Sequence, residues 1–201
     1  MAFNINEFAS NGLVLGGARP TQFSVDLFPP FASTNSARIK FMVNATSLPG
    51  MYIDNVPVAY FGRQIKFNGD RVFQDWRVSV LNDEDFPVRA ILERWSNEIN
   101  TLVSNRLDPA RYATGYKRTA EVTQYGKDGR TLRLCRMYGL FPTQIEDLQN
   151  DWGATNQIQT FGVTFSIDYW ETINHGMALD TYNALLPDDG SFSGTPPATT
   201  I

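Results

Sequence analysis

The chain has 201 residues, of which 42% are hydrophobic and 19% are charged, and its 17 Lys and Arg against 21 Asp and Glu give a net charge of -4. This composition is that of a globular domain with a substantial core, so it excludes a wholly disordered chain. The acidic balance argues against a protein that grips nucleic acid by its phosphates, because such proteins usually carry an excess of basic residues. The charged fraction is also low for a soluble domain, and a surface poor in charge often contacts other protein.

Cysteine usage and the lack of apolar runs bear on the compartment. Cys135 is the only cysteine, so neither an intrachain disulfide nor a cysteine-based zinc site is expected, which suits a reducing compartment. The first ten residues lack the basic start and apolar run of a signal peptide. No apolar stretch approaches the roughly 20 residues of a spanning helix, so we expect no membrane insertion.

The sequence predicts one domain with an extension at each end. Residues 1–18 mix Asn, Gly and Ala with a short apolar patch, and we interpret them as an N-terminal arm. The domain itself is expected over residues 19–178. The end of the chain is rich in Pro, Asp, Gly, Ser and Thr, so residues 179–201 are interpreted as a flexible C-terminal extension or an arm that a partner orders.

Alternation of apolar and polar residues predicts strands over residues 23–27, 37–45 and 76–80. Between Ser47 and Asp70 this alternation fails, although the segment is rich in apolar residues. We predict a long loop there, closed by a turn at Asn68-Gly69. A long apolar loop generally has a docking partner.

One helix is predicted from Pro87 to Val103, because its apolar residues recur with the helical period on one face. These residues are Val88, Ile91, Leu92, Trp95, Ile99, Leu102 and Val103. The run Asp83-Glu84-Asp85 is interpreted as an N-terminal cap rather than a cation site, since the glycine-centred alternation of oxygen ligands is missing. Two oppositely charged pairs spaced by four support the outer face: Arg89 with Glu93, and Arg94 with Glu98.

The second half of the chain predicts a hairpin and one long strand. The hairpin covers residues 120–134, turns at Gly126–Gly129 and ends at Phe141-Pro142. After a compact loop, strict alternation predicts a strand over residues 161–169. The predicted core includes four large aromatic residues: Trp76, Trp95, Trp152 and Tyr169.

Residues suited to catalysis are sparse. The only histidine, His175, lies beyond the last predicted strand, so a Ser-His-Asp arrangement would need it to fold back. Cys135 is interpreted as a packed thiol, and Asp70 and Asp75 have no surroundings that would separate their pKa values. The glycine-rich start of the chain lacks the Lys-Ser/Thr of a phosphate loop. We therefore predict no enzyme, no metal site and no cofactor.

Two ordered blocks point to a known family. The first is Asn68-Gly69-Asp70-Arg71-Val72-Phe73-Gln74-Asp75-Trp76, followed by Val78, Val80 and Asn82-Asp83-Glu84. The second is Gly139-Leu140-Phe141-Pro142, then Leu148, Asp151-Trp152, Asn156-Gln157-Ile158-Gln159-Thr160-Phe161 and Asp168-Tyr169-Trp170-Glu171. Together they span roughly Ala37 to Glu171, and they resemble the tail tube proteins of contractile-tailed, T-even-like bacteriophages.

This resemblance implies a mainly β fold, an antiparallel β-barrel or sandwich with one flanking α-helix, assembled as hexameric rings that stack into a hollow tube. Such a protein is a structural component of the virion tail, assembles in the host cytoplasm and forms the conduit for genome ejection. The implied partners are further copies of itself, the tail sheath, baseplate and tail terminator proteins, and double-stranded DNA that passes non-specifically. The alternatives are a tube initiator or baseplate protein, the tube of a contractile bacteriocin or type VI-like secretion system, and an unrelated β-rich enzyme.

Two assembly surfaces are predicted on this basis. The ring-stacking interface is assigned to apolar residues of the long loop: Met51, Ile53, Val58, Tyr60 and Phe61. The channel lining is assigned to the polar faces of strands, because the alternate residues must fill the core. Its members are Glu121, Thr123, Thr164, Ser166 and Asp168. The competing interpretation places these polar faces on the outside, against a sheath.

Overall fold

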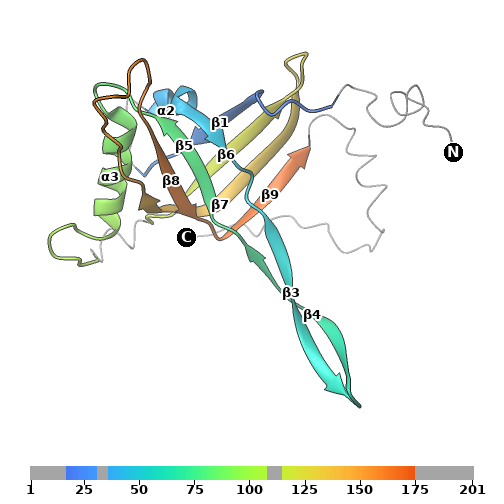
Figure 1. Ribbon diagram of the computed structural model, residues 1–201. Coiled ribbons are helices and arrows are strands. Elements are labelled where there is room, and N and C mark those ends of the chain that lie inside the picture. Colours follow the sequence, from blue (N-terminus) through green and yellow to red (C-terminus); the bar gives the residue numbers. More distant parts are fainter. Residues whose placement is uncertain (1–16, 31–35, 108–114, 175–201) are drawn as a thin grey trace, which may run out of the picture.

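The computed structural model describes residues 17–30, 36–107 and 115–174, and Figure 1 shows the arrangement of its helices and strands. The described elements are β1 (Phe23–Leu27), α2 (Ser36–Met42), β2 (Val43–Thr46), β3 (Met51–Tyr60), β4 (Arg63–Phe73), β5 (Trp76–Leu81), α3 (Pro87–Ile99), β6 (Arg118–Tyr125), β7 (Thr131–Ile145), β8 (Thr160–Ser166) and β9 (Tyr169–Asn174). His175, the expected C-terminal extension and nearly all of the expected N-terminal arm lie outside the described residues.

Seven strands form one antiparallel sheet, in which β1-β6-β7-β8-β5-β2 are successive neighbours and β9 pairs with β7. The 15 residues of β7 serve two groups of strands, because its first part pairs with β6 and β9 and its last part with β8. We call β1-β6-β7-β9 the first half-sheet and β7-β8-β5-β2 the second half-sheet. The expectation of a mainly β, antiparallel fold is confirmed, but the sheet does not close into a barrel.

The core lies between the half-sheets and α3. Trp76 of β5 and Trp95 of α3 are both fully buried, as predicted, and each packs against Phe165 of β8. Their indole nitrogens find acceptors: Trp95 donates to the carbonyl of Tyr116 at 2.9 Å, and Trp76 donates to Thr46 Oγ1 at 2.9 Å. The predicted alternation over β5 and β8 is therefore confirmed.

A short helix, α2, replaces the first part of the strand predicted over residues 37–45. Ile39 is buried, whereas Phe41 is 79% exposed, although a strand would place both on one face. Ile39 instead shares a helical face with Met42, and both pack on the core, as does Val43, the first residue of β2. The helix packs against β1 and leads directly into β2, so it lies between the two ends of the open sheet (Figure 1).

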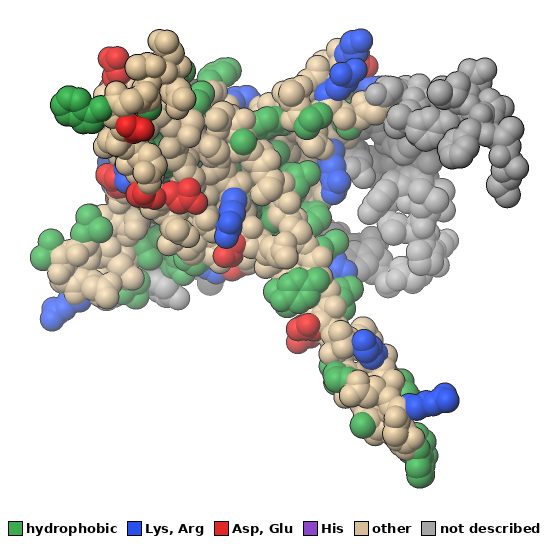
Figure 2. All heavy atoms as spheres, viewed as in Figure 1, with side chains coloured by type: hydrophobic (Ala, Val, Ile, Leu, Met, Phe, Trp, Pro, Cys, Tyr) green, Lys and Arg blue, Asp and Glu red, His purple; other side chains and the backbone are tan. Residues whose placement is uncertain are grey.

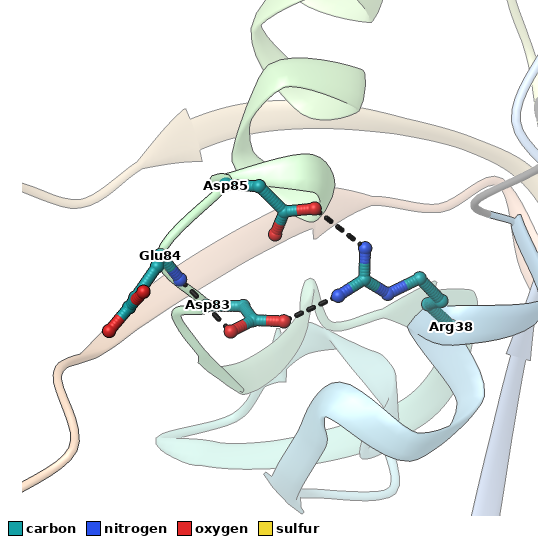
Figure 3. Close-up of polar contacts among 4 residues, drawn as sticks. All are labelled: Arg38, Asp83, Glu84 and Asp85. Atoms are coloured by element: carbon teal, nitrogen blue, oxygen red, sulfur yellow. Dashed lines mark hydrogen bonds and ion pairs between the residues drawn. The ribbon is translucent and has the colours of Figure 1, made fainter.

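The acidic run before α3 does not cap that helix. The N-cap residue is Phe86, with φ of 51° and no side-chain cap. The carboxylates of Asp83 and Asp85 instead bind the guanidinium of Arg38 in α2, as Figure 3 shows, with 2.8 Å between Arg38 Nη1 and Asp85 Oδ2. This hydrogen bond lowers the pKa of Asp85 and raises that of Arg38. The run therefore ties α2 to the start of α3.

The helix also ends earlier than predicted. α3 stops at Ile99, where Asn100 adopts an extended conformation, and Leu102 and Val103 are exposed rather than buried. The hydrophobic period therefore continues in the sequence beyond the end of the helix. The two predicted pairs on the outer face are confirmed, at 2.7 Å for Arg89–Glu93 and 3.3 Å for Arg94–Glu98.

The region predicted as a long loop is a regular hairpin, β3–β4, which projects from the body as a two-stranded arm (Figure 1). Its turn is at Phe61-Gly62, whereas Asn68 and Gly69 lie within β4 beside an irregularity in the register. Gly69 permits a close approach there, because a Cβ at this position would lie 3.0 Å from the carbonyl oxygen of Asp54 and the backbone of β3 would have to shift. The sequence does not show these strands clearly, because nearly all residues of β3 and β4 are exposed. Apolar residues therefore occur on both faces of the hairpin, and no face is polar along its whole length.

Two further strand ends differ from the prediction. β7 does not end at Phe141-Pro142 but continues to Ile145, and the single strand predicted over 161–169 is divided into β8 and β9.

Two of the four predicted core aromatics are on the surface: Trp152 is fully exposed and Tyr169 is 48% exposed. Both residues were predicted to be buried because their side chains are large and apolar. The sequence does not show toward which side of the fold such a side chain points.

Candidate assembly surfaces

The β3–β4 hairpin has one apolar face along its outer part. Cross-strand partners share a face, and the pairs Val56 with Phe67 and Val58 with Ile65 are apolar on both strands. The alternate pair Ala59 with Gln64 lies on the opposite face, together with Pro57 and Lys66. In the isolated chain these apolar side chains are about half exposed, because within the described residues the hairpin packs mainly on itself.

The tip of the hairpin presents an aromatic side chain in an unfavourable backbone conformation. Tyr60 pairs with Arg63, which leaves Phe61 and Gly62 as a two-residue turn with φ of 45° and 77°. Positive φ at both positions is the type I′ arrangement, which normally uses Asn, Asp or Gly first. Phe61 is 90% exposed and contacts the ring of Tyr60 edge to face, with ring centroids 4.5 Å apart. A bulky side chain rarely adopts positive φ, so the tip of the hairpin is a strained and exposed site.

The residues predicted for ring stacking all lie on this hairpin but do not share one face. Val58 and Tyr60 are on the apolar face, Phe61 is at the tip, and Met51 and Ile53 lie near the base on the other face. Sequence reasoning missed three members of the apolar face: Val56, Ile65 and Phe67. The signal that could have found them is the apolar alternation on each side of Phe61-Gly62.

The first half-sheet has two free edges. Within the described ranges, β1 pairs only with β6, and β9 pairs only with β7. Adjacent strands alternate in direction across these four strands, so β1 and β9 run in opposite directions. Unpaired backbone groups along two such edges are a template for pairing with another chain.

One row of charged residues crosses the face of the first half-sheet that points away from the core. The register places Asp26, Glu121, Arg136 and Glu171 side by side on β1, β6, β7 and β9. Arg136 Nε lies 2.8 Å from Glu121 Oε1, and Tyr138 donates a hydrogen bond to Glu171, which raises the pKa of Tyr138. The row has three carboxylates and one guanidinium, and Lys40 of α2 adds a second positive charge beside it, with Nζ 3.0 Å from Asp26 Oδ2. The group therefore keeps one excess negative charge.

The structure separates the residues predicted for the channel lining. Glu121 and Thr123 lie on the outward face of the first half-sheet, although Thr123 is buried by its neighbours. Thr164 and Ser166 belong to β8 in the second half-sheet, and Asp168 lies between β8 and β9, where Lys117 Nζ contacts it at 2.6 Å. Asp26, Arg136 and Glu171 were missed, because only the strand pairing shows that they join Glu121 in one row.

Groups that could support chemistry are few in the part of the chain that the structure describes. Among residues 17–30, 36–107 and 115–174, no cluster of three or more His, Cys, Asp or Glu is placed to hold a metal ion. Cys135 is buried, and this burial raises the pKa of its thiol, which disfavours the nucleophilic thiolate. No helix in the described ranges is both long and apolar enough to cross a membrane.

Comparison with known proteins agrees with this architecture. A family model described as phage tail tube protein matches residues 18–173. The tail tube protein gp19 of Enterobacteria phage T4 is 37% identical over 155 residues, covering 77% of this chain and 91% of gp19, and gp19 of phage T6 matches equally.

Solved structures of contractile systems share the fold at low sequence identity. A chain of the sheath–tube complex of the PVC extracellular contractile injection system has a TM-score of 0.56 at 15% identity, covering 86% of this chain and 99% of that one. A chain of the tube-terminating cap of the anti-feeding prophage also has a TM-score of 0.56, at 16% identity, covering 79% of this chain and 91% of that one. Because the family model spans most of the chain and gp19 is similar over nearly its whole length, this chain belongs to the phage tail tube protein family.

Proposed function

We propose that this tail tube protein assembles into hexameric rings, which stack to form the inner conduit of a contractile tail. The observation that carries the proposal is the pair of free edges on the first half-sheet. Since β1 and β9 run in opposite directions, β9 of one copy can pair with β1 of the next and continue the antiparallel order around a ring. A contact between two different edges closes by rotation, and closure removes both open edges.

The position of the core supports placing the first half-sheet on the inside of such a ring. Its core-facing side is covered by the second half-sheet and α3, whereas among the described elements only α2 reaches its outward face, at β1, where Lys40 contacts Asp26 (Figure 1). In a closed ring the outside has a larger circumference than the inside, so the second half-sheet and α3 fit on the outside. The outward face of the first half-sheet then lines the channel. Glu121 is then a lining residue, whereas Thr164 and Ser166 lie beyond the lining on β8.

The charges of the lining suit the passage of DNA. Asp26, Glu121 and Glu171 face two cations, because Arg136 is engaged by Glu121 and Lys40 of α2 is engaged by Asp26, so one negative charge remains in excess. A basic wall would bind phosphates and release counterions, whereas an acidic wall repels DNA only weakly through screened water. We infer that double-stranded DNA leaves through this channel without being held.

The β3–β4 hairpin supports stacking between rings. Its apolar face and its tip need a partner, and the arm reaches well beyond the body of its own subunit (Figure 1). The partners of the finished tube are then further copies, with a sheath around it and baseplate and terminator proteins at its ends. We propose that the protein assembles in the host cytoplasm and is a component of the virion tail.

The assembly itself is tested on purified protein by native mass and electron microscopy, with and without a tail initiator. We expect hexameric rings and hollow tubes, because edge pairing and hairpin stacking are both heterologous contacts. Protein that stays monomeric at high concentration with an initiator present would contradict the proposal. Single rings that cap a tube but never polymerise would favour the tube initiator or baseplate alternative.

The lining is tested by Glu171→Lys, with Glu171→Gln as the milder change that keeps a hydrogen-bond acceptor for Tyr138. We expect tubes to form with both, and genome ejection to be slowed more by Lys than by Gln, because each positive charge is repeated six times around a ring. The defect should ease as ionic strength rises, since salt screens the attraction to phosphates. If tubes with Glu171→Lys eject DNA at the normal rate in low salt, the outward face of the first half-sheet does not line the channel. It would then lie elsewhere, such as against a sheath.

A further inference from the structure

We propose a second contact between stacked rings, at the outer rim of the tube, in which two loops at opposite ends of α3 meet. One is the Trp152 loop, residues 146–159, and the other is the Leu102 loop, residues 100–107. The Trp152 loop of a copy in one ring would dock on the Leu102 loop of a copy in the next ring. The inference rests on the proposed function, since it requires that rings stack.

The Trp152 loop is an ordered surface that presents its tryptophan to solvent. Trp152 is fully exposed, and Ile158 in the same loop is 71% exposed. The turn around Trp152 is fixed, because Asp151 accepts a hydrogen bond from the backbone N–H of Gly153 at 2.9 Å. Gln159 ties the two ends of the loop together by donating to the carbonyl of Gln149 at 3.1 Å. A fully exposed tryptophan on a loop whose backbone is held by hydrogen bonds is the kind of side chain that anchors an interface.

The Leu102 loop is equally well defined and also apolar at its tip. An antiparallel bridge between Asn100 and Leu107 closes it, and Asn105 donates its backbone N–H to the carbonyl of Thr101 at 2.8 Å. Leu102 and Val103 are almost entirely exposed. These two side chains continue the apolar period of α3 beyond its end and have no core to enter.

The two loops are placed to meet in a stack. They lie at opposite ends of α3, and the β3–β4 hairpin extends on the side of the Leu102 loop (Figure 1). A hairpin that reaches the next ring therefore brings the Leu102 loop to the same ring. Every copy then presents its Trp152 loop to the ring on the other side, as a head-to-tail contact requires.

The charges of the two loops are complementary. The Trp152 loop contains Glu146, Asp147 and Asp151 with no basic residue, whereas the only charged residue of the Leu102 loop is Arg106. All four side chains are exposed. Figure 2 shows acidic side chains around the first loop and a basic side chain at the end of the second. Opposite potentials on the two ends of one subunit favour stacking in a single orientation.

The test measures the protein concentration needed for tube growth, by sedimentation and electron microscopy, in single and paired variants. We expect Trp152→Ala to raise this concentration about tenfold or more, since an exposed anchor is lost at six contacts per ring junction. Arg106→Glu and Asp147→Lys should each raise it as well, and the two changes together should restore growth, because the reversed charges again attract. Glu84→Lys, a carboxylate outside both loops, is the matched control and should not rescue Arg106→Glu.

Unchanged tube growth with both Trp152→Ala and Arg106→Glu would overturn the inference while leaving hairpin stacking intact. Normal tubes that no longer assemble a sheath would also overturn it, because the loops would then be a sheath-binding surface. Wild-type protein that forms no tubes would instead overturn the proposed function, and the inference with it.

Discussion

Replacing Trp95 by Ala should lower the free energy of unfolding of the subunit by about 3–5 kcal/mol. Trp95 is completely buried between α3 and β8, where its ring packs against Phe165 with centroids 6.1 Å apart. The change leaves a large cavity and also removes the donor to the carbonyl of Tyr116, which then lacks its indole partner. Urea unfolding of rings dissociated into subunits, followed by circular dichroism, measures the difference.

Trp152→Ala is the matched control, because it removes the same side chain from the surface. We expect a change within about 0.5 kcal/mol, as for other exposed positions. A loss below about 1 kcal/mol for Trp95→Ala would mean that this side chain is not part of the subunit core. A large loss for Trp152→Ala would mean that the Trp152 loop folds back onto its own subunit.

These two tryptophans also show what the sequence can predict of the fold. Trp95 lies in the middle of the apolar period that α3 contains, between Leu92 and Ile99, so its burial could be predicted from spacing. Trp152 stands in a loop without any period, and its size was the only reason to place it in the core. Periodicity predicts burial well when an element has one solvent-exposed face and one buried face, whereas residue type alone predicts burial poorly.

The elements that were mispredicted share a physical cause. α2 has seven residues, which is about two turns, so its two core-packed residues, Ile39 and Met42, are too few to distinguish a helix from a short strand by spacing. β3 and β4 are regular strands, but each exposes both faces in the isolated subunit, and apolar residues alternate with others only in their outer part, next to Phe61-Gly62. A strand whose partner belongs to another molecule carries a pattern that one chain does not explain.

The candidate surfaces were predictable to different degrees. The apolar excess between Ser47 and Asp70 indicated a docking segment, and its residues do lie on one projecting arm. The charge row on the first half-sheet was not predictable, because Asp26 and Glu171 are far apart in sequence and only pairing through β6 and β7 aligns them. Local pattern can identify a segment that needs a partner, whereas a surface assembled across four strands requires the topology.

The largest assembly effect is expected from a charged pair on the apolar face of the hairpin. Val58→Asp combined with Ile65→Lys replaces two cross-strand partners and should abolish tubes while leaving single rings. The new charges are opposite and lie on cross-strand partners, so they attract each other. Two carboxylates at the same positions would instead repel each other and destabilise the hairpin. In a stacked tube, however, both charges would have to be buried against the next ring without water.

Ala59→Asp combined with Gln64→Lys provides the matched control, because this pair is adjacent along the hairpin but lies on its opposite face. Both double variants add the same charges to the same arm, and within the described residues the arm packs mainly on itself, so neither should change the unfolding free energy of the body. Only the side of the ribbon differs between them. If electron microscopy shows tubes with the first pair as readily as with the second, the apolar face is not the stacking surface; if both pairs abolish tubes, the hairpin is embedded on both faces. Rings alone with the first pair and tubes with the second would assign ring stacking to the face that bears Val56, Val58, Ile65 and Phe67.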